Sequence, residues 1–144
     1  MTSGVSPSYY ADTDFHLLNM AIEDNLHRLC EQNYVEGLLA AFITDKDGVV
    51  ILKSAQQDAP ENIVDPTFFT SFTIANNQAS KLGLKQNRYI MSMYDQYQFV
   101  QYDSNPLIIT VVGGADANTG FLINFGRKLV ELAKPLASAM QEKM

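Results

Sequence analysis

The chain has 144 residues, of which 47% are apolar and 18% are charged, with one cysteine and a formal net charge of -6. This length and balance predict a single globular domain with a well-filled core. The acidic charge argues against nucleic-acid binding, which depends on clustered Lys and Arg side chains. One cysteine excludes an intrachain disulfide, and no apolar run approaches the roughly 20 residues of a membrane span.

The beginning of the chain is polar and rich in turn-forming residues, without a hydrophobic period. We expect a flexible leader over residues 1–13 and one domain over residues 14–144. Asp14 is a suitable N-cap for a first helix that continues to about Asn33. The apolar side chains that give this helix its stripe are Phe15, Leu18, Ile22, Leu26 and Leu29.

Two apolar runs, at residues 37–43 and 49–52, predict neighbouring strands. The polar residues that separate the runs are Asp45, Lys46, Asp47 and Gly48. An acidic loop can suggest calcium, but the further oxygen ligands and closing glutamate of an EF-hand are absent. We therefore interpret the segment as a hairpin turn, in which Asp and Gly tolerate the positive φ of a tight turn.

A second helix is predicted to begin at Asp65 and Pro66, which suit the N-cap and the first helical position. Gly83 is predicted to end it, because glycine readily adopts the left-handed conformation of a C-cap. The apolar side chains at helical spacing are Phe68, Phe72, Ala75, Ala79 and Leu82. The intervening residues are mostly short and uncharged, so this face can approach another helix without burying a full charge.

Three strands are predicted next, at residues 89–94, 97–103 and 107–112. The third is apolar almost throughout, which is typical of a central strand covered on both faces, so helices are expected on both sides of the sheet. Short connections between most neighbouring strands predict antiparallel pairing.

Asn118 or Thr119 is predicted to cap the last helix. Pro135 is predicted to bend or end that helix, because an interior proline costs about 3 kcal/mol. The helix carries apolar side chains with helical period at Leu122, Phe125, Leu129, Leu132 and Leu136. The complete order is α-β-β-α-β-β-β-α, which predicts an α/β (α+β) fold around a five-stranded antiparallel sheet.

The candidate catalytic and ligand-binding residues are few. The glycine-rich residues 113–120 lie between a strand and a helix, but Phe121 and Leu122 stand where a phosphate-binding loop needs its lysine and hydroxyl. His16, His27 and Cys30 form no recognised metal or nucleophile pattern, so we interpret the histidines as solvated and Cys30 as a small residue at the edge of the helix stripe. We predict a non-enzymatic protein without catalytic residues, metal or cofactor. A domain that senses a nucleotide or small molecule is the alternative.

The strand at residues 88–94 begins a run of three strands and should lie at a sheet edge. Unpaired backbone groups at such an edge can recruit a partner strand, and methionines make the surface adaptable. The opposite interpretation is that Ile90, Met91 and Met93 belong to the core, since a buried strand alternates in the same way. The sequence leaves both interpretations open for these residues.

An ordered set of segments lies between about Val35 and Met140, and its members begin at Gly37, Asp45, Ala59, Gln78, Tyr97, Pro106 and Asn118. In order and spacing these segments resemble the MEK-binding-partner-one family of MAP-kinase scaffold subunits of Ragulator complexes. The first helix matches weakly, and the leader departs from the family pattern. The resemblance implies a roadblock-type, profilin-like domain of three layers, with two helices on one face of the sheet and one on the other.

The resemblance also implies an adaptor that pairs with a second roadblock-type subunit and joins other Ragulator subunits, one of them lipid-anchored. It implies a peripheral place on the cytoplasmic face of late endosomes and lysosomes without direct membrane insertion, with Rag GTPases in mTORC1 activation and with the MEK and ERK kinases as further partners. A self-pairing roadblock module of a transport motor is another alternative. The expected partner interface comprises the edge strand (Arg88, Tyr89, Ile90, Met91, Ser92, Met93, Tyr94) and the second helix (Phe69, Thr70, Thr73, Asn76, Asn77, Ser80, Lys81).

Overall fold

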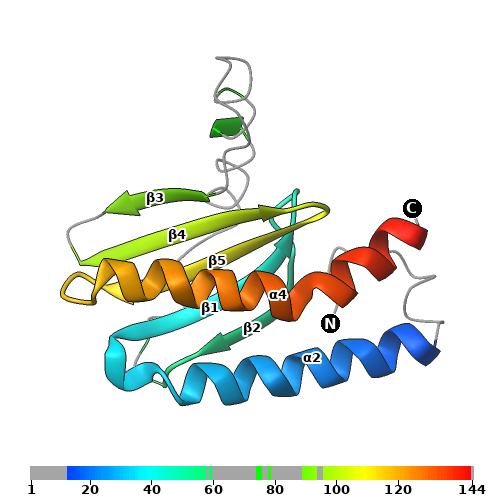
Figure 1. The fold of residues 1–144 in the computed structure, drawn as a ribbon, viewed down its shortest axis with the longest axis horizontal. Coiled ribbons are helices and arrows are strands. Elements are labelled where there is room, and N and C mark those ends of the chain that lie inside the picture. Colours follow the sequence, from blue (N-terminus) through cyan, green and yellow to red (C-terminus); the bar gives the residue numbers. More distant parts are fainter. Residues whose placement is uncertain are drawn as a thin grey trace.

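The computed structural model describes residues 13–57, 59, 74, 75, 78, 89–93 and 96–143. Its elements lie in the predicted order, as Figure 1 shows. They are α2 (Thr13–Glu31), the 3-10 helix η1 (Tyr34–Glu36), β1 (Leu38–Asp45), β2 (Val50–Ala55), β3 (Tyr89–Met93), β4 (Tyr97–Ser104), β5 (Leu107–Gly114) and α4 (Thr119–Lys143). Residues 1–12 of the predicted leader lie outside the described part.

The five strands form one sheet in the order β2-β1-β5-β4-β3, and every neighbouring pair is antiparallel. The antiparallel prediction is therefore confirmed. Strand β5 lies at the centre and is buried from Leu107 to Gly113, as its continuous apolar sequence predicts. Strands β2 and β3 are the two edges of the sheet.

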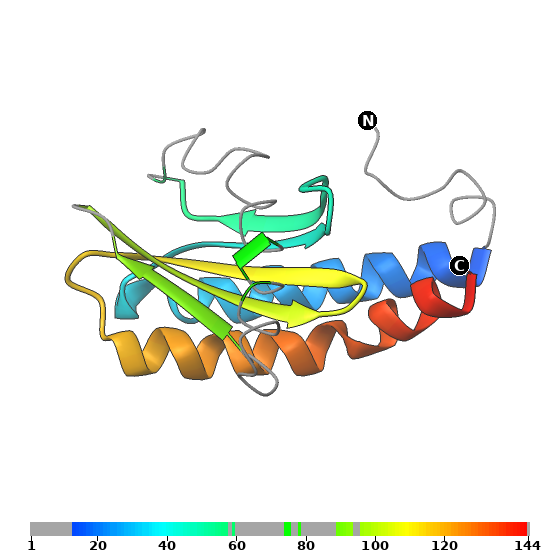
Figure 2. The ribbon, with the colours of Figure 1, turned by 90° about the horizontal axis from the view of Figure 1, so that it is seen from above.

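Helices α2 and α4 lie side by side on one face of the sheet, as Figures 1 and 2 show together. Helix α2 packs over β2 and β1, whereas α4 packs over β4 and β5. The buried side chains of the α2 stripe include Phe15, Ile22 and Leu26, which confirms the helical period read from the sequence. The core between the sheet and these two helices is continuous.

The opposite face of the sheet is also buried over its central strands, at Phe42, Phe99 and Val112. The predicted second helix belongs to residues that the structure describes only at Ile74, Ala75 and Gln78, and all three are helical and exposed. Ala75, one of the apolar residues at helical spacing, is thus at the surface. A single small apolar residue at helical spacing does not determine which side of a helix is covered.

Helix α4 begins with a side-chain cap and passes through its proline. The Phe121 backbone N–H donates to Asn118 Oδ1 at 2.9 Å, so Asn118 is the capping residue. The helix continues through Pro135 to Lys143, so the prediction that Pro135 could end it is wrong. In Figure 1 the red C-terminal part of α4 turns away from the line of the orange part, as expected where a helix loses a backbone hydrogen bond.

The acidic segment between β1 and β2 is a turn, as predicted. Asp45 Oδ1 accepts hydrogen bonds from the backbone N–H groups of Asp47 (2.9 Å) and Val49 (3.0 Å). Gly48 has a φ of 88°, which glycine adopts without the steric cost of a side chain. The Asp45 carboxylate therefore organises the turn by accepting from its own backbone.

Close contact between Tyr102 and Gly126 holds α4 against β4. The Tyr102 hydroxyl donates to the Ile123 backbone carbonyl on α4, so this aromatic ring spans the gap from strand to helix. A Cβ atom placed on Gly126 would lie 2.2 Å from Cε1 of the Tyr102 ring. Glycine at this position is required for the two elements to approach each other.

We predict that Gly126→Ala lowers the free energy of unfolding by about 1 kcal/mol or more in denaturant titrations. Glycine to alanine inside a helix ordinarily stabilises a protein by roughly 0.5–1 kcal/mol. Here the added methyl group meets the Tyr102 ring, and overpacking of this kind costs about 1–3 kcal/mol.

The control places the same substitution in a Tyr102→Leu background, which removes the ring. In that background Gly126→Ala should be neutral or stabilising, because the space for the methyl group is open. Equal destabilisation in both backgrounds would contradict the close contact as the cause.

Candidate partner interface

Strand β3 is the described part of the predicted edge strand. It pairs with β4 in a continuous register from Tyr89 opposite Tyr102 to Met93 opposite Gln98, and within the described residues β4 is its only strand neighbour. Arg88 and Tyr94, the two ends of the predicted segment, lie outside the described residues. The edge position is confirmed, and an edge of this kind presents a row of backbone N–H and C=O groups.

The side chains of β3 alternate between the two faces of the sheet. Tyr89, Met91 and Met93 lie on the face that carries the helices, because Tyr102 and Val100 opposite them belong to the core beneath α4. Met91 is 36% exposed and Met93 is 61% exposed, whereas Tyr89 is half-buried. The structure therefore places both methionines at the surface and not in the core.

The second half of the predicted interface belongs to the predicted second helix. All seven residues proposed on the second helix lie outside the described residues: Phe69, Thr70, Thr73, Asn76, Asn77, Ser80 and Lys81. Their neighbour Ile74 is described, and its side chain is 60% exposed. Ile74 is a large apolar residue among short ones, and this contrast is the sequence signal that could have marked it as part of a surface.

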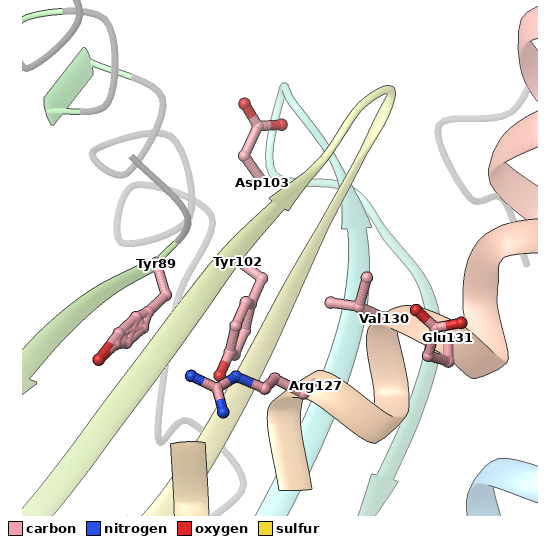
Figure 3. Close-up of a pocket in the computed structure, with 6 residues that line it drawn as sticks. All are labelled: Tyr89, Tyr102, Asp103, Arg127, Val130 and Glu131. Atoms are coloured by element: carbon pink, nitrogen blue, oxygen red, sulfur yellow. The ribbon is translucent and has the colours of Figure 1, made fainter. Parts of the chain in front are cut away.

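A cavity of about 500 Å³ opens beside β3, between the end of the sheet and α4 (Figure 3). The aromatic side of the cavity is formed by Tyr89 and Tyr102, whose ring centroids are 5.5 Å apart. Its remaining wall residues are Asp103, Arg127, Val130 and Glu131. Asp103 and Glu131 thus border one cavity from a strand and a helix, although Figure 3 shows the Asp103 carboxylate pointing away from the Tyr102 ring.

Charged groups surround the aromatic floor of this cavity. Asp103 lies 3.8 Å from Lys46 Nζ, and Glu131 lies 2.7 Å from Lys134 Nζ. Figure 3 shows the Arg127 guanidinium beside the Tyr102 hydroxyl. Burial raises the pKa of Tyr102 to about 12, although the positive charge of Arg127 acts in the opposite direction. The Tyr102 phenol is therefore neutral at physiological pH and serves as a hydrogen-bond donor.

A buried glutamine, Gln98, forms hydrogen bonds to several residues of the glycine-rich segment 113–120. Gln98 Nε2 lies 3.0 Å from the carbonyl oxygen of Gly114 and 2.7 Å from that of Ala117, and Thr119 Oγ1 donates to Gln98 Oε1 at 2.6 Å. Carbonyl oxygens converge on this amide, whereas a phosphate-binding loop turns its N–H groups inward. The segment has the geometry of a strand exit and helix cap.

Residues with possible nucleophilic or acid–base roles form hydrogen bonds between α2 and β2. His27 Nδ1 and Ser54 Oγ share a hydrogen bond at 2.9 Å, and the Tyr34 hydroxyl lies 3.3 Å from the same oxygen. His27 is exposed, in agreement with its interpretation as a solvated histidine, and it bonds to Ser54 as well. Cys30 is fully buried, and burial raises the pKa of its thiol to about 11, so it is protonated at neutral pH and poorly reactive.

The part of the chain that the structure describes contains neither a metal-binding cluster nor a helix able to span a membrane. Within this part, no three His, Cys, Asp or Glu side chains gather as a metal site requires. Neither of the long helices α2 and α4 combines the length and apolar character needed to cross a bilayer.

Sequence comparison gives two results. The pattern of the family described as mitogen-activated protein kinase kinase 1 interacting matches residues 20–141. The Ragulator complex protein LAMTOR3-A of Xenopus laevis is 40% identical to this chain over 106 residues, which cover 74% of this chain and 86% of that relative.

Two solved structures from bacteria have the same fold. The gliding protein MglB of Thermus thermophilus aligns with a TM-score of 0.67 at 16% identity, over 83% of this chain and 93% of that one. A Roadblock/LC7 domain from Streptomyces avermitilis aligns with a TM-score of 0.59 at 15% identity, over 76% of this chain and 95% of that one. At these identities the likeness establishes the roadblock fold alone.

We predict that the raised pKa of Tyr102 makes stability fall between about pH 10 and about pH 12. In this window the unfolded phenol has lost its proton while the folded phenol retains it, so deprotonation favours unfolding. Denaturant titrations across the window should show a shallower pH dependence for Tyr102→Phe, which has no ionisable hydroxyl. Since Cys30 and Tyr34 also have raised pKa values, part of the slope should persist. An unchanged slope in Tyr102→Phe would contradict the assignment.

Proposed function

The chain belongs to the family of mitogen-activated protein kinase kinase 1 interacting proteins, and we propose that it acts as a non-enzymatic adaptor subunit of a Ragulator-type complex. The family membership confirms the resemblance read from the sequence motifs. The name of the Xenopus laevis relative describes a Ragulator complex protein, which supports the proposed role.

The observation that carries the proposal is the open edge of β3, where a strand with two exposed methionines meets no further strand among the described residues. The polar side chains with catalytic potential form structural hydrogen bonds that join strands to helices or loops. They are Gln98, Ser54 and His27. A surface for association is therefore better supported than a reaction centre.

Pairing with a second roadblock-type subunit is the central step of this function. The partner's edge strand would add to β3 within the segment of residues 88–94, and main-chain hydrogen bonds across the junction would continue the sheet. Phe69, Thr70, Thr73, Asn76, Asn77, Ser80 and Lys81 remain the proposed helical half of the interface. Methionines 91 and 93 lie beside that junction and can adapt to the partner's side chains.

The wider role is to hold signalling proteins together at a membrane. We propose that other Ragulator subunits, one of them lipid-anchored, hold the pair peripherally on the cytoplasmic face of late endosomes and lysosomes. There the assembly would support Rag GTPase-dependent activation of mTORC1 and would scaffold the MEK and ERK kinases. Tethering raises the effective concentration of partners without any chemistry in the adaptor. The family name supports the kinase branch.

We predict that a second roadblock-type subunit from the same species forms a stable complex with this chain and protects β3 from hydrogen exchange. Alternate backbone amides of Tyr89–Met93 face away from β4 and should exchange quickly in the isolated chain. In the complex these amides should exchange at least about tenfold more slowly, as measured by NMR, because they donate to the added strand.

The opposite edge provides a control within the same molecule. The amides of Val50–Ala55 in β2 should keep their exchange rates when the partner binds, since β2 lies four strands away from the junction. Protection of β2 in place of β3, or failure of the two subunits to co-elute in size-exclusion chromatography, would contradict the proposed pairing.

A further inference from the structure

Strand β3 is attached to the sheet through one neighbour. It has five residues, it pairs with β4, and within the described residues it meets no second strand. Two strands alone form a marginally stable sheet, because water competes for each backbone hydrogen bond. The opposite edge strand, β2, is also joined to α2 by the hydrogen bond between His27 and Ser54. For β3, a side-chain contact with the core has the corresponding role.

Tyr89 makes this contact. Among the described residues of β3, Tyr89 is the one that packs against the core between the sheet and the helices. It lies opposite Tyr102 in the register, and the two ring centroids are 5.5 Å apart at an interplanar angle of 44° (Figure 3). Aromatic pairs favour this separation, and aromatic pairs across two strands stabilise a sheet. The Tyr102 ring is therefore the surface against which β3 packs.

Helix α4 in turn fixes the position of the Tyr102 ring. The Tyr102 side chain is buried, and its hydroxyl donates to the Ile123 backbone carbonyl. A Cβ atom placed on Gly126 would lie 2.2 Å from Cε1 of the ring, so the ring has no space to move toward the helix. Movement away from the helix would break a buried hydrogen bond. One side chain thus connects α4 and β4 to β3.

We propose that Tyr102 is a positioning residue for the partner interface, because through Tyr89 it keeps β3 paired with β4. The inference rests on the proposed pairing with a second roadblock-type subunit and identifies the contact that prepares the edge for it. An added strand needs β3 in extended form within the sheet. Where β3 is paired in only part of the molecules, the apparent affinity for the subunit falls by that fraction.

The first test uses the full chain without a partner. Tyr89→Leu removes the ring from β3, and the β3 amides that donate to β4 should then exchange at least about fivefold faster in NMR hydrogen exchange. Tyr89→Phe retains the ring and should restore slow exchange. Amides of β1 are the internal reference, because β1 lies between two strands and opens with the whole domain. Equal acceleration in β1 and β3, or none in β3, would contradict the local role of the ring contact.

A double-mutant cycle tests Tyr102 itself. Tyr102→Leu should speed β3 exchange relative to β1 in the original chain. In the Tyr89→Leu background it should cause no further selective acceleration, since the ring contact is already absent. Equal acceleration of β1 and β3 in both backgrounds would mean that Tyr102 acts only on overall stability, which would overturn the proposal. Tyr102→Met, whose flexible side chain fills more of the space, replaces Tyr102→Leu where circular dichroism shows the latter to be unfolded.

The affinity for the second roadblock-type subunit tests the consequence for function. Isothermal titration calorimetry should show a Kd at least about threefold higher for Tyr102→Leu, because a smaller fraction of β3 is paired. Tyr102→Phe retains the ring and should restore most of the affinity. Ile22→Val is the matched control, since Ile22 is a buried residue of α2, which packs over β2 and β1. The Kd of this variant should stay at the original value.

The positioning role and the pairing can fail separately. If the original chain and Tyr102→Leu bind the subunit equally well, the positioning role is overturned and the pairing stands. If Ile22→Val weakens binding as much as Tyr102→Leu does, overall stability explains the loss, and the positioning role is again overturned. If the original chain does not bind the subunit, the proposed pairing is overturned, and exchange in β3 still decides whether Tyr102 holds the strand.

Discussion

The attachment of α4 to β4 determines which surfaces of this protein are available. Two side chains of one strand make it: Gln98 binds the loop that leads into α4, and Tyr102 reaches the Ile123 carbonyl one turn inside the helix. Gly126 lets the helix lie directly on the Tyr102 ring. With α4 fixed over β4 and β5, the neighbouring strand β3 is left at the edge of the sheet with its methionines exposed.

Buried polar groups have structural roles in this domain. Gln98 satisfies carbonyl oxygens at the end of β5, and Gln101 lies within hydrogen-bonding distance of Thr110 on the next strand. The Ser54 hydroxyl joins His27 of α2 to β2. Such bonds fix the positions of helices and strands, because a buried polar group left unpaired is costly. These bonds hold the helices and strands in place while β3 keeps an open edge among the described residues.

Most of the elements could be predicted from the sequence, because their signals are local. The α2 stripe, the Asp45 turn and the Asn118 cap each depend on residues a few positions apart. Contacts between distant residues have no such local signal, and the bond between His27 and Ser54 on another element is one of them. Pro135 is accommodated because α4 is held by packing against β4, β5 and α2.

The sequence by itself determined the order of the elements, the edge position of β3 and the membership of a family, since hydrophobic period, turn residues and motifs are written in consecutive positions. Only the tertiary structure decided that Met91 and Met93 are exposed, because a strand with alternating apolar and polar residues has the same sequence pattern whether or not a helix covers it. It also decided that Tyr89, Asp103 and Glu131 share one cavity. These residues lie close together because of where α4 packs across the sheet. That position depends on the contact between Tyr102 and Gly126, which no local sequence pattern indicates.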